Sequence, residues 1–296
     1  MPELPEVETI RRLLCRERPD CPSLVGRRIL GAWVGWSRTL AEPTPAEFRR
    51  RIRGQTIRRI ERRAKHLLLR LSRDTLMIHL GMSGSLHLRR GRGARRLTPQ
   101  VRTRIHAVPE DPSQYCRLSI LLSDGWRLDF DDPRKFGRVR FVTDPARALR
   151  GIGPEPLSTA FTAATLAARL RTHRRALKPL LLDQTFVAGL GNIYVDEALH
   201  RAGLHPRTRS DRLLPVHARA LWRAIRAVLR EAIRWNGTTF DAVYGGGGFQ
   251  RHLRVYQHTG QPCRRCRTPI RRIVVTQRGT HFCPRCQPLR PARQTH

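Results

Sequence analysis

The sequence of 296 residues predicts an α+β protein with more than one domain, and three observations lead to this prediction. Residues 25–143 contain short alternating apolar runs separated by glycine, aspartate and proline, which is typical of a β-sandwich or barrel. From about residue 155 the apolar pattern becomes helical, and residues 250–296 carry four closely spaced cysteines. A chain of this length can form two compact units and a small additional one.

A short helix is expected at residues 2–15, before the sandwich. Pro5 suits the first helical position, and the acidic Glu6 and Glu8 lie in the first turn, where the helix dipole favours negative charge. The apolar stripe of this helix consists of Val7, Ile10, Leu13 and Leu14.

The helical part of the sequence contains one long amphipathic stretch near residues 210–237. Ser210 and Asp211 are candidates for its cap, and Asn236-Gly237 predicts its end. Its apolar face consists of Leu221, Ile225, Val228, Leu229 and Ile233. A shorter helix is expected to begin at Gly191-Asn192, which would make its N-terminus a possible anion site.

The charge of the chain indicates a polyanionic partner. Lys and Arg number 58 against 23 Asp and Glu, which gives a net charge of +35. Nucleic acid is the partner that such a charge favours. With 40% hydrophobic residues, the sequence excludes a wholly disordered basic protein, and it has no stretch of eighteen apolar residues that could span a membrane. The N-terminus shows no signal-peptide pattern, so we expect a cytoplasmic location.

Lysine is rare among these basic residues. Only Lys65, Lys135 and Lys178 occur, and the remaining 55 of the 58 are arginines. A compact ammonium group differs from a planar guanidinium, so each remaining lysine is a candidate for a role that arginine cannot fill. The alternative is that these three lysines have no special role.

Four cysteines near the C-terminus have the spacing of a metal site. Cys263, Cys266, Cys283 and Cys286 form the pattern C-x2-C-x16-C-x2-C, which is typical of one structural zinc ion with four thiolate ligands. Two disulfides are the alternative, which a reducing cytosol disfavours. The residues between the two pairs predict a hairpin of two strands with its turn at Arg278-Gly279. With all four ligands supplied by the protein, the zinc would have no open position for catalysis.

The first residues allow amine chemistry. If the initiator methionine is removed, Pro2 becomes a secondary α-amine, and an α-amino group has a pKa of about 8, against about 10.4 for lysine. A free amine beside Glu3 is a plausible nucleophile for carbonyl-type carbon, with an acid next to it. The alternative is that Pro2 is only the end of the chain.

Six further motifs occur in a fixed order along the chain. They are PELPEVET, HLGMSGSL, DPRKFG, GPEPL, GLGNIYVDE and NGTTF, and the four-cysteine segment follows them. In this order they resemble the formamidopyrimidine-DNA glycosylase family, bacterial enzymes that remove oxidised purines, and the opening PELPEVE is closer to this branch than to the endonuclease VIII branch. The resemblance implies an N-terminal catalytic β-sandwich domain at 1–150 and a helix-two-turn-helix DNA-binding domain at 151–245. A zinc finger at 246–290 and a tail at 291–296 complete the chain.

The resemblance also implies a mechanism on duplex DNA with one nucleotide flipped out of the stack. Pro2 attacks the first carbon of the sugar and forms an imine, while Glu3 protonates the ring oxygen. Elimination of both phosphates then leaves a one-nucleotide gap. Glu6 matches a second carboxylate near the site, although a plain helix-dipole role fits it equally well.

Further residues match the DNA contacts of the family. The resemblance assigns phosphate contacts to four residues: Lys65, His79, Asn192 and Arg278. It places Lys178 near the flipped nucleotide, and it implies that Met82, Arg134 and Phe136 fill the space that the flipped base leaves. Simpler alternatives are a core histidine at 79, a helix cap at 192 and a solvated turn charge at 278. The implied partner is double-stranded DNA with oxidised bases or abasic sites, bound by a monomer that associates with the bacterial nucleoid.

The sequence also departs from the family pattern. The basic segment at 89–104 is longer than usual, and the segment that caps the lesion is VYGGGGFQ at 243–250. These departures leave the preferred lesion open. Three other functions are alternatives: an endonuclease VIII-like glycosylase for oxidised pyrimidines, a non-catalytic damaged-DNA-binding protein, and a zinc-ribbon nucleic-acid-binding protein without enzyme activity.

Overall fold

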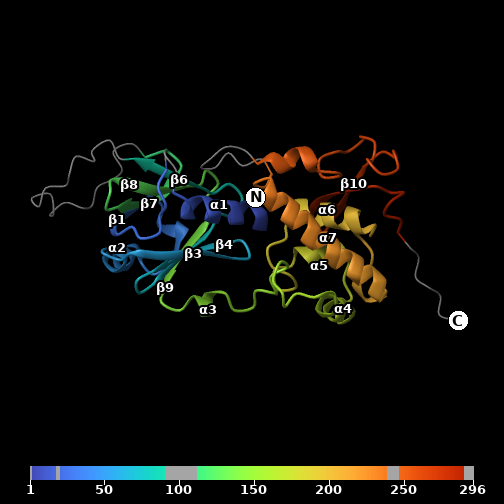
Figure 1. Cartoon of the computed structure of the whole chain (residues 1–296), viewed down its shortest axis with the longest axis horizontal. Coiled ribbons are helices and arrows are strands. Elements are labelled where there is room, and N and C mark those ends of the chain that lie inside the picture. The colour runs from blue at the N-terminus through green and yellow to red at the C-terminus, as the bar shows by residue number, and fades with distance from the viewer. Residues whose placement is uncertain (1, 18–20, 91–111, 239–246, 290–296) are drawn as a thin grey trace, which may run out of the picture. The chain divides into compact units, whose positions relative to one another are not determined.

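A computed structural model describes residues 2–17, 21–90, 112–238 and 247–289 of the chain (Figure 1). The chain divides into two compact units. Among the described residues, one unit contains Pro2 and Glu6–Arg150, and the other contains Glu3–Pro5 and the parts described after residue 150. Most of the basic segment 89–104, the first half of the segment 243–250 and the tail 291–296 lie outside the described residues.

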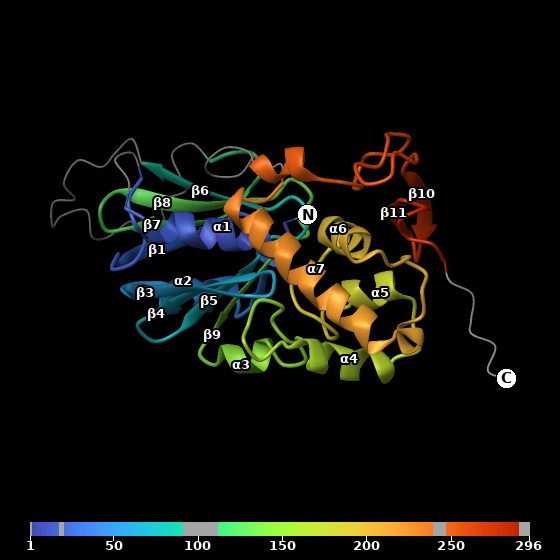
Figure 2. The same ribbon diagram turned by 45° about the vertical axis from the view of Figure 1, so that its right-hand side comes forward.

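The first unit is the predicted β-sandwich, and Figure 2 shows its two sheets as two layers. One sheet has the order β1-β7-β8-β6, and its strands span Ile29–Val34, Cys116–Leu122, Trp126–Asp131 and Ser85–Arg90. The other has the order β2-β9-β5-β4-β3, with strands at Leu40–Glu42, Arg138–Val142, Thr75–His79, His66–Leu71 and Ile57–Arg63. Helices α2 (Pro45–Ile52) and α3 (Pro145–Ala148) complete the unit.

Alternating side chains of the two sheets form one apolar core, as the period of two predicts. The expected N-terminal helix is present as α1, Leu4–Cys15, so it begins two residues later than predicted. Its residues Val7, Ile10 and Leu14 lie in the core of the sandwich. The stripe that the sequence shows therefore buries the helix against the sheets.

The second unit is helical and ends in a hairpin. Its helices are α4 (Ala163–Arg171), α5 (Leu177–Leu182), α6 (Asn192–Ala202) and α7 (Pro215–Arg234), and the 3-10 helix η4 covers Gly248–His252. All five predicted face residues of α7 are buried in the core of this unit. Helix α7 ends before Asn236 and Gly237, which both have positive φ, as predicted. None of the described helices is long and apolar enough to cross a membrane.

The start of α7 differs from the prediction. Ser210 and Asp211 lie in the separate short helix η3 (Ser210–Arg212), and α7 begins at Pro215. A residue before proline is disfavoured in the helical conformation, and Leu214 is indeed extended, with ψ of 157°. The proline therefore separates the predicted caps from the helix.

The C-terminal hairpin also corrects the prediction. Strands β10 (Arg271–Val275) and β11 (Arg278–Phe282) pair so that Val275 lies opposite Arg278, which leaves Thr276 and Gln277 as the turn. The predicted turn at Arg278-Gly279 is wrong, because both residues belong to β11. The turn residues have φ of 47° and 60°, in the left-handed region that a tight hairpin needs and that non-glycine residues rarely adopt.

Candidate functional site

Glu3 supplies the cap of helix α6. The helix begins after Gly191, which has no side chain to accept the first N–H groups. One carboxylate oxygen of Glu3 accepts the N–H of Gly191 at 2.6 Å, and the other accepts the N–H of Ile193 at 2.9 Å. Glu3 is 1% exposed. Backbone N–H groups and the helix dipole therefore hold this carboxylate in one position, directly bonded in sequence to Pro2.

Glycine is required at the first position of this cap. A Cβ on Gly191 would lie 2.4 Å from the carboxyl carbon of Glu3, far inside van der Waals contact. This explains the second glycine of the motif GLGNIY: the backbone there must approach the carboxylate of Glu3, which lies 188 residues earlier in the sequence. Glu6, the second predicted acid, is buried in the first turn of α1.

In the first unit, Lys65 and His79 are brought together. Arg63 pairs with His66 at the end of the β3-β4 hairpin, so Lys65 lies in its two-residue turn. His66 pairs with His79 across β4 and β5, and the centres of the two imidazole rings are 4.9 Å apart. Ala64, the other turn residue, has φ of 54°. The tight turn therefore places the buried lysine beside the end of β5.

The tautomer of His79 follows from its contacts. Its Nδ1 accepts the N–H of Gly81 at 3.2 Å, so Nε2 carries the proton and is available as a donor, as a phosphate contact requires. Burial lowers the pKa of His79 to about 4, and the positive charges of His66 and Lys65 act in the same direction. The ring is therefore neutral at pH 7.

This pKa predicts a loss of stability in mild acid. The folded-state pKa lies below the ordinary value of 6.5, so the unfolded chain binds the extra proton between about pH 6.5 and pH 4. We expect His79 to reduce the free energy of unfolding by about 3 kcal/mol as the pH falls through this window. Denaturant titrations of wild type and His79→Gln at several pH values measure this. An unchanged pH slope in the variant would contradict the assignment.

Two loops of the sandwich carry the residues predicted to fill the space of a flipped base. Met82 and Phe136 are 39% and 51% exposed, although both are large and apolar. The guanidinium of Arg134 lies 5.1 Å from the centre of the Phe136 ring. Gly81 has φ of 63°, and a Cβ there would lie 2.6 Å from the backbone carbonyl carbon of Phe136. The structure therefore brings all three predicted residues to one place.

Asp132 connects these two loops, and the sequence analysis missed it. One of its carboxylate oxygens accepts the hydroxyl of Ser83 at 2.6 Å, and the other accepts the N–H of Gly137 at 2.7 Å. It is fully buried. Lys135, which lies between Asp132 and Gly137 in sequence, has φ of 60° and places its ammonium 4.1 Å from the centre of the Trp36 ring. The shape of the DPRKFG loop thus rests on a buried acid and a cation-π contact.

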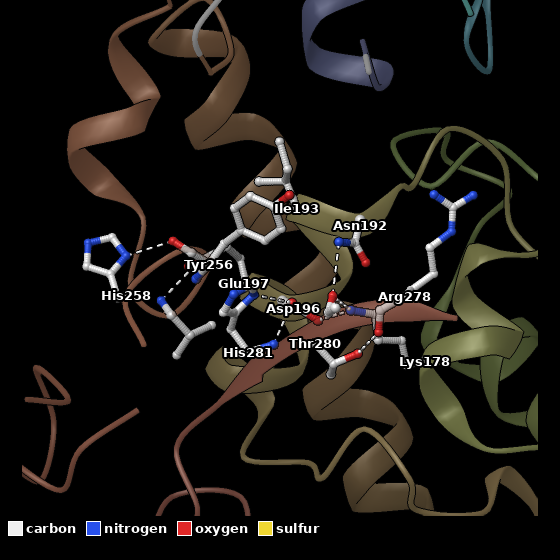
Figure 3. Close-up of polar contacts among 12 residues, drawn as sticks. Lys178, Asn192, Ile193, Asp196, Glu197, Tyr256, His258, Arg278, Thr280 and His281 are labelled. Carbon is white, nitrogen blue, oxygen red and sulfur yellow. Dashed lines mark hydrogen bonds and ion pairs between the residues drawn. The ribbon is translucent and has the colours of Figure 1, made fainter. Parts of the chain in front are cut away.

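A polar network in the second unit contains the other predicted residues (Figure 3). Lys178 of α5 donates to Asp196 of α6 at 2.7 Å and to the carbonyl of Gly279 at 3.0 Å. Asn192, at the start of α6, donates its amide to the same carbonyl at 3.1 Å. Arg278 is exposed at the start of β11, next to Gly279. The structure therefore brings Lys178, Asn192 and Arg278 together around one carbonyl group.

Helix α6 fixes the segment before the finger as well. The carboxylate of Glu197 is buried and accepts the N–H groups of Arg254, Val255 and Tyr256 at 2.9–3.0 Å. Burial raises the pKa of Glu197, although these three donors oppose the rise. Asp196 and Glu197 were not singled out from the sequence. Their signal was the scarcity of acids in a chain of charge +35, where two adjacent acids in one helix need partners.

The four cysteines form one cluster. The sulfur atoms of Cys263, Cys266, Cys283 and Cys286 all lie within 4.8 Å of one another, and three of the sulfur-sulfur distances are 3.4, 3.4 and 3.9 Å. A disulfide bond would need about 2.05 Å, whereas four thiolates at 2.3 Å around a tetrahedral zinc lie about 3.8 Å apart. The cluster therefore fits one structural zinc ion with every position filled by the protein.

Comparison with known families covers most of the chain. Residues 1–139 match the formamidopyrimidine-DNA glycosylase N-terminal domain, and residues 152–243 match the H2TH domain of the same enzymes. Residues 260–289 match the zinc finger found in FPG and IleRS. The three matches follow one another in the order that the motifs of the sequence suggest.

Individual relatives agree with these matches. The chain is 39% identical to the formamidopyrimidine-DNA glycosylase of Enterococcus faecalis, over 99% of both chains. It is 45% identical to that of Chloroflexus aggregans, over 98% of this chain and 99% of the relative. A Lactococcus lactis FPG mutant in complex with a Fapy-dG containing DNA has a TM-score of 0.85 at 33% identity, over 97% of this chain and 100% of that one. The sites, the domain matches and these relatives together show that the chain belongs to the formamidopyrimidine-DNA glycosylase family.

Proposed function

We propose that the chain is a bifunctional DNA glycosylase and AP lyase of base excision repair that removes oxidised purines. The observation that carries this proposal is the carboxylate of Glu3, fixed by the N-terminus of α6 and bonded in sequence to Pro2. A nucleophilic amine and a group that exchanges protons are the two parts that imine chemistry at a sugar carbon requires. The relatives named above are formamidopyrimidine-DNA glycosylases according to their names.

The proposed reaction starts on an extruded nucleotide. With Met1 removed, the Pro2 nitrogen attacks the first carbon of the sugar. The base leaves with the electrons of its bond to this carbon and takes a proton from water. Glu3 takes the proton that leaves the amine and gives it to the ring oxygen of the sugar, so the ring opens to an iminium ion. Loss of a proton from the second sugar carbon then expels the 3′ phosphate, and loss of a proton from the fourth carbon expels the 5′ phosphate. Water hydrolyses the imine and releases the sugar fragment, which leaves a one-nucleotide gap.

The remaining predicted residues have proposed roles in holding the DNA. Lys65, the Nε2–H of His79, Asn192 and Arg278 are proposed phosphate contacts, which fix register without reading sequence. Met82 and Phe136 are proposed to occupy the space of the extruded base, with Arg134 donating to the base that lost its partner. The exposed apolar side chains of these loops support this role, because a core position would bury them. We also propose a monomer that associates with the bacterial nucleoid.

Borohydride reduction tests the proposal directly. We expect a covalent adduct between the protein and duplex DNA with an abasic site, and peptide mapping should place it on Pro2. Protein that retains Met1 is the matched control, and it should give no adduct at residue 2. An adduct found only on a lysine, or none with Met1 removed, would refute the mechanism. The second outcome would favour a non-catalytic damaged-DNA-binding protein.

A lesion panel tests the substrate class. We expect release of formamidopyrimidines, and of 8-oxoguanine paired with cytosine, to be faster than release of thymine glycol. Single-turnover excision from duplexes that differ only in the lesion provides the comparison. Faster release of thymine glycol would instead assign the chain an endonuclease VIII-like preference.

A further inference from the structure

The ammonium group of Lys178 is enclosed by protein. The side chain is 0% exposed, and so is that of its partner Asp196. Its Nζ donates to Asp196 of α6 and to the carbonyl of Gly279 in β11, and Figure 3 shows these bonds converging from three elements of the same unit. A lysine arranged in this way uses its charge on protein groups.

One of the two bonds of Lys178 ends on β11, the strand that carries Arg278. The carbonyl of Gly279 accepts Lys178 and also the amide of Asn192. Two residues along, the N–H of His281 donates to the second oxygen of Asp196 at 2.8 Å. The backbone next to Arg278 is therefore held at two points, both connected to the pair of Lys178 and Asp196.

The other side of Arg278 needs such support. Arg278 directly follows Thr276 and Gln277, whose left-handed conformations are unfavourable for side chains with a Cβ, above all for a β-branched one. Backbone in such a turn persists only where its surroundings fix it. The buried pair supplies this fixation from α5 and α6.

The residue type at 178 agrees with this arrangement. Burial lowers the pKa of Lys178, and the carboxylate of Asp196 opposes the shift. A compact ammonium fits between a carboxylate and a carbonyl, whereas a planar guanidinium is larger and has a fixed fork. This explains a lysine in a chain whose basic residues are otherwise almost all arginines.

We propose that Lys178 is a positioning residue, which acts on DNA through Gly279 and Arg278 and not by a contact of its own, with Asp196 as its partner. The inference rests on the proposed role of Arg278 as a phosphate contact. In this proposal Lys178 and Asp196 maintain the geometry of the hairpin. The effects on DNA binding of substituting Lys178 and of substituting Arg278 therefore depend on each other.

A double-mutant cycle tests this dependence. The variants are Arg278→Ala, the pair Lys178→Met with Asp196→Asn, and all three together. The paired change avoids leaving one buried charge without its partner, which would destabilise the fold for unrelated reasons. The measurement is the dissociation constant for a duplex with a tetrahydrofuran abasic analogue, as a function of salt. Binding of this duplex can be measured without the glycosylase reaction.

We expect Arg278→Ala to weaken binding about 10- to 100-fold, as loss of one charge-assisted bond does, and to reduce the salt slope by about 0.9. The variant with both Lys178→Met and Asp196→Asn should lose a similar factor in affinity for the duplex, and it should contain as much zinc as the wild type. The triple variant should bind no more weakly than Arg278→Ala. Losses that multiply, with a salt slope reduced by about twice 0.9, would show that Lys178 contacts DNA itself and would overturn the inference.

Controls separate this inference from the proposed function. Arg271→Ala removes an exposed arginine from the same hairpin and should reduce binding less than Arg278→Ala. If Arg278→Ala has no effect, the premise and the inference fail together. If losses multiply while borohydride still traps Pro2, only the inference fails.

Discussion

Replacing Glu3 with glutamine is expected to slow base release by about 10²- to 10⁴-fold, the usual contribution of a positioned acid-base group. Glutamine has nearly the same shape, but it cannot accept the proton of the Pro2 amine or deliver it to the sugar. Its amide nitrogen would also face one of the two N–H groups that Glu3 accepts at 2.6 and 2.9 Å. Single-turnover excision of a formamidopyrimidine measures the effect, and binding of the abasic analogue should change much less.

Two further variants make this result specific. Glu17→Gln changes an acid whose side chain is 71% exposed, and it should leave the rate unchanged. Gly191→Ala keeps the acid but introduces a Cβ at 2.4 Å from its carboxyl carbon, so it should displace Glu3 and reduce the rate as well. A wild-type rate in Glu3→Gln would remove Glu3 from the proposed mechanism.

Removal of zinc is expected to have the second large effect. Binding of zinc to four thiolates contributes on the order of 10 kcal/mol to the folding of small zinc modules. Cys283→Ser should therefore release the hairpin that carries Arg278 and weaken DNA binding about 10-fold or more, since a charge-assisted contact to phosphate is lost. Metal analysis should give one zinc per chain in the wild type and less in the variant.

The sandwich should keep its fold in the variant without zinc, because its core contains none of these cysteines. Cys15→Ser is the matched control, since Cys15 lies on α1 outside the cluster, and it should keep both zinc and DNA affinity. Active protein that contains no zinc would contradict the assignment. A trapped adduct on Pro2 is still expected without zinc when the DNA concentration is high.

Those features that depend on local periodicity could be predicted from the sequence. Alternation of apolar residues gave the strands of the sandwich, and the spacing of five apolar residues gave the buried face of α7. Cysteine spacing gave the cluster, because the ligand pairs lie on tight turns that are local in the chain. The candidate site residues of the first unit came from the resemblance to the family, and the structure places Lys65 beside His79.

Features that depend on long-range polar contacts could not be predicted. Asp132 and Asp196 each connect elements that are far apart in sequence, and a buried carboxylate has no periodicity that reveals its partners. The position of the β10-β11 turn was missed because Thr276 and Gln277 are poor turn residues, whereas the nearby glycine resembles one. The cap of α7 was missed because the effect of Pro215 outweighed the capping side chains.

Because two of its three lysines are buried, this chain has few amines that a reagent can reach. Besides the α-amine, it has three lysine amines, and Lys65 and Lys178 are both buried. Lys135 is exposed, so among the side-chain amines it is the one that open sugar aldehydes and acylating reagents can reach. Pro2 is buried as well, so in Lys135→Arg protein an amine-reactive reagent at neutral pH should label Pro2 and the two remaining lysines slowly. That single substitution should therefore remove most of the reactivity of the wild-type chain toward such reagents.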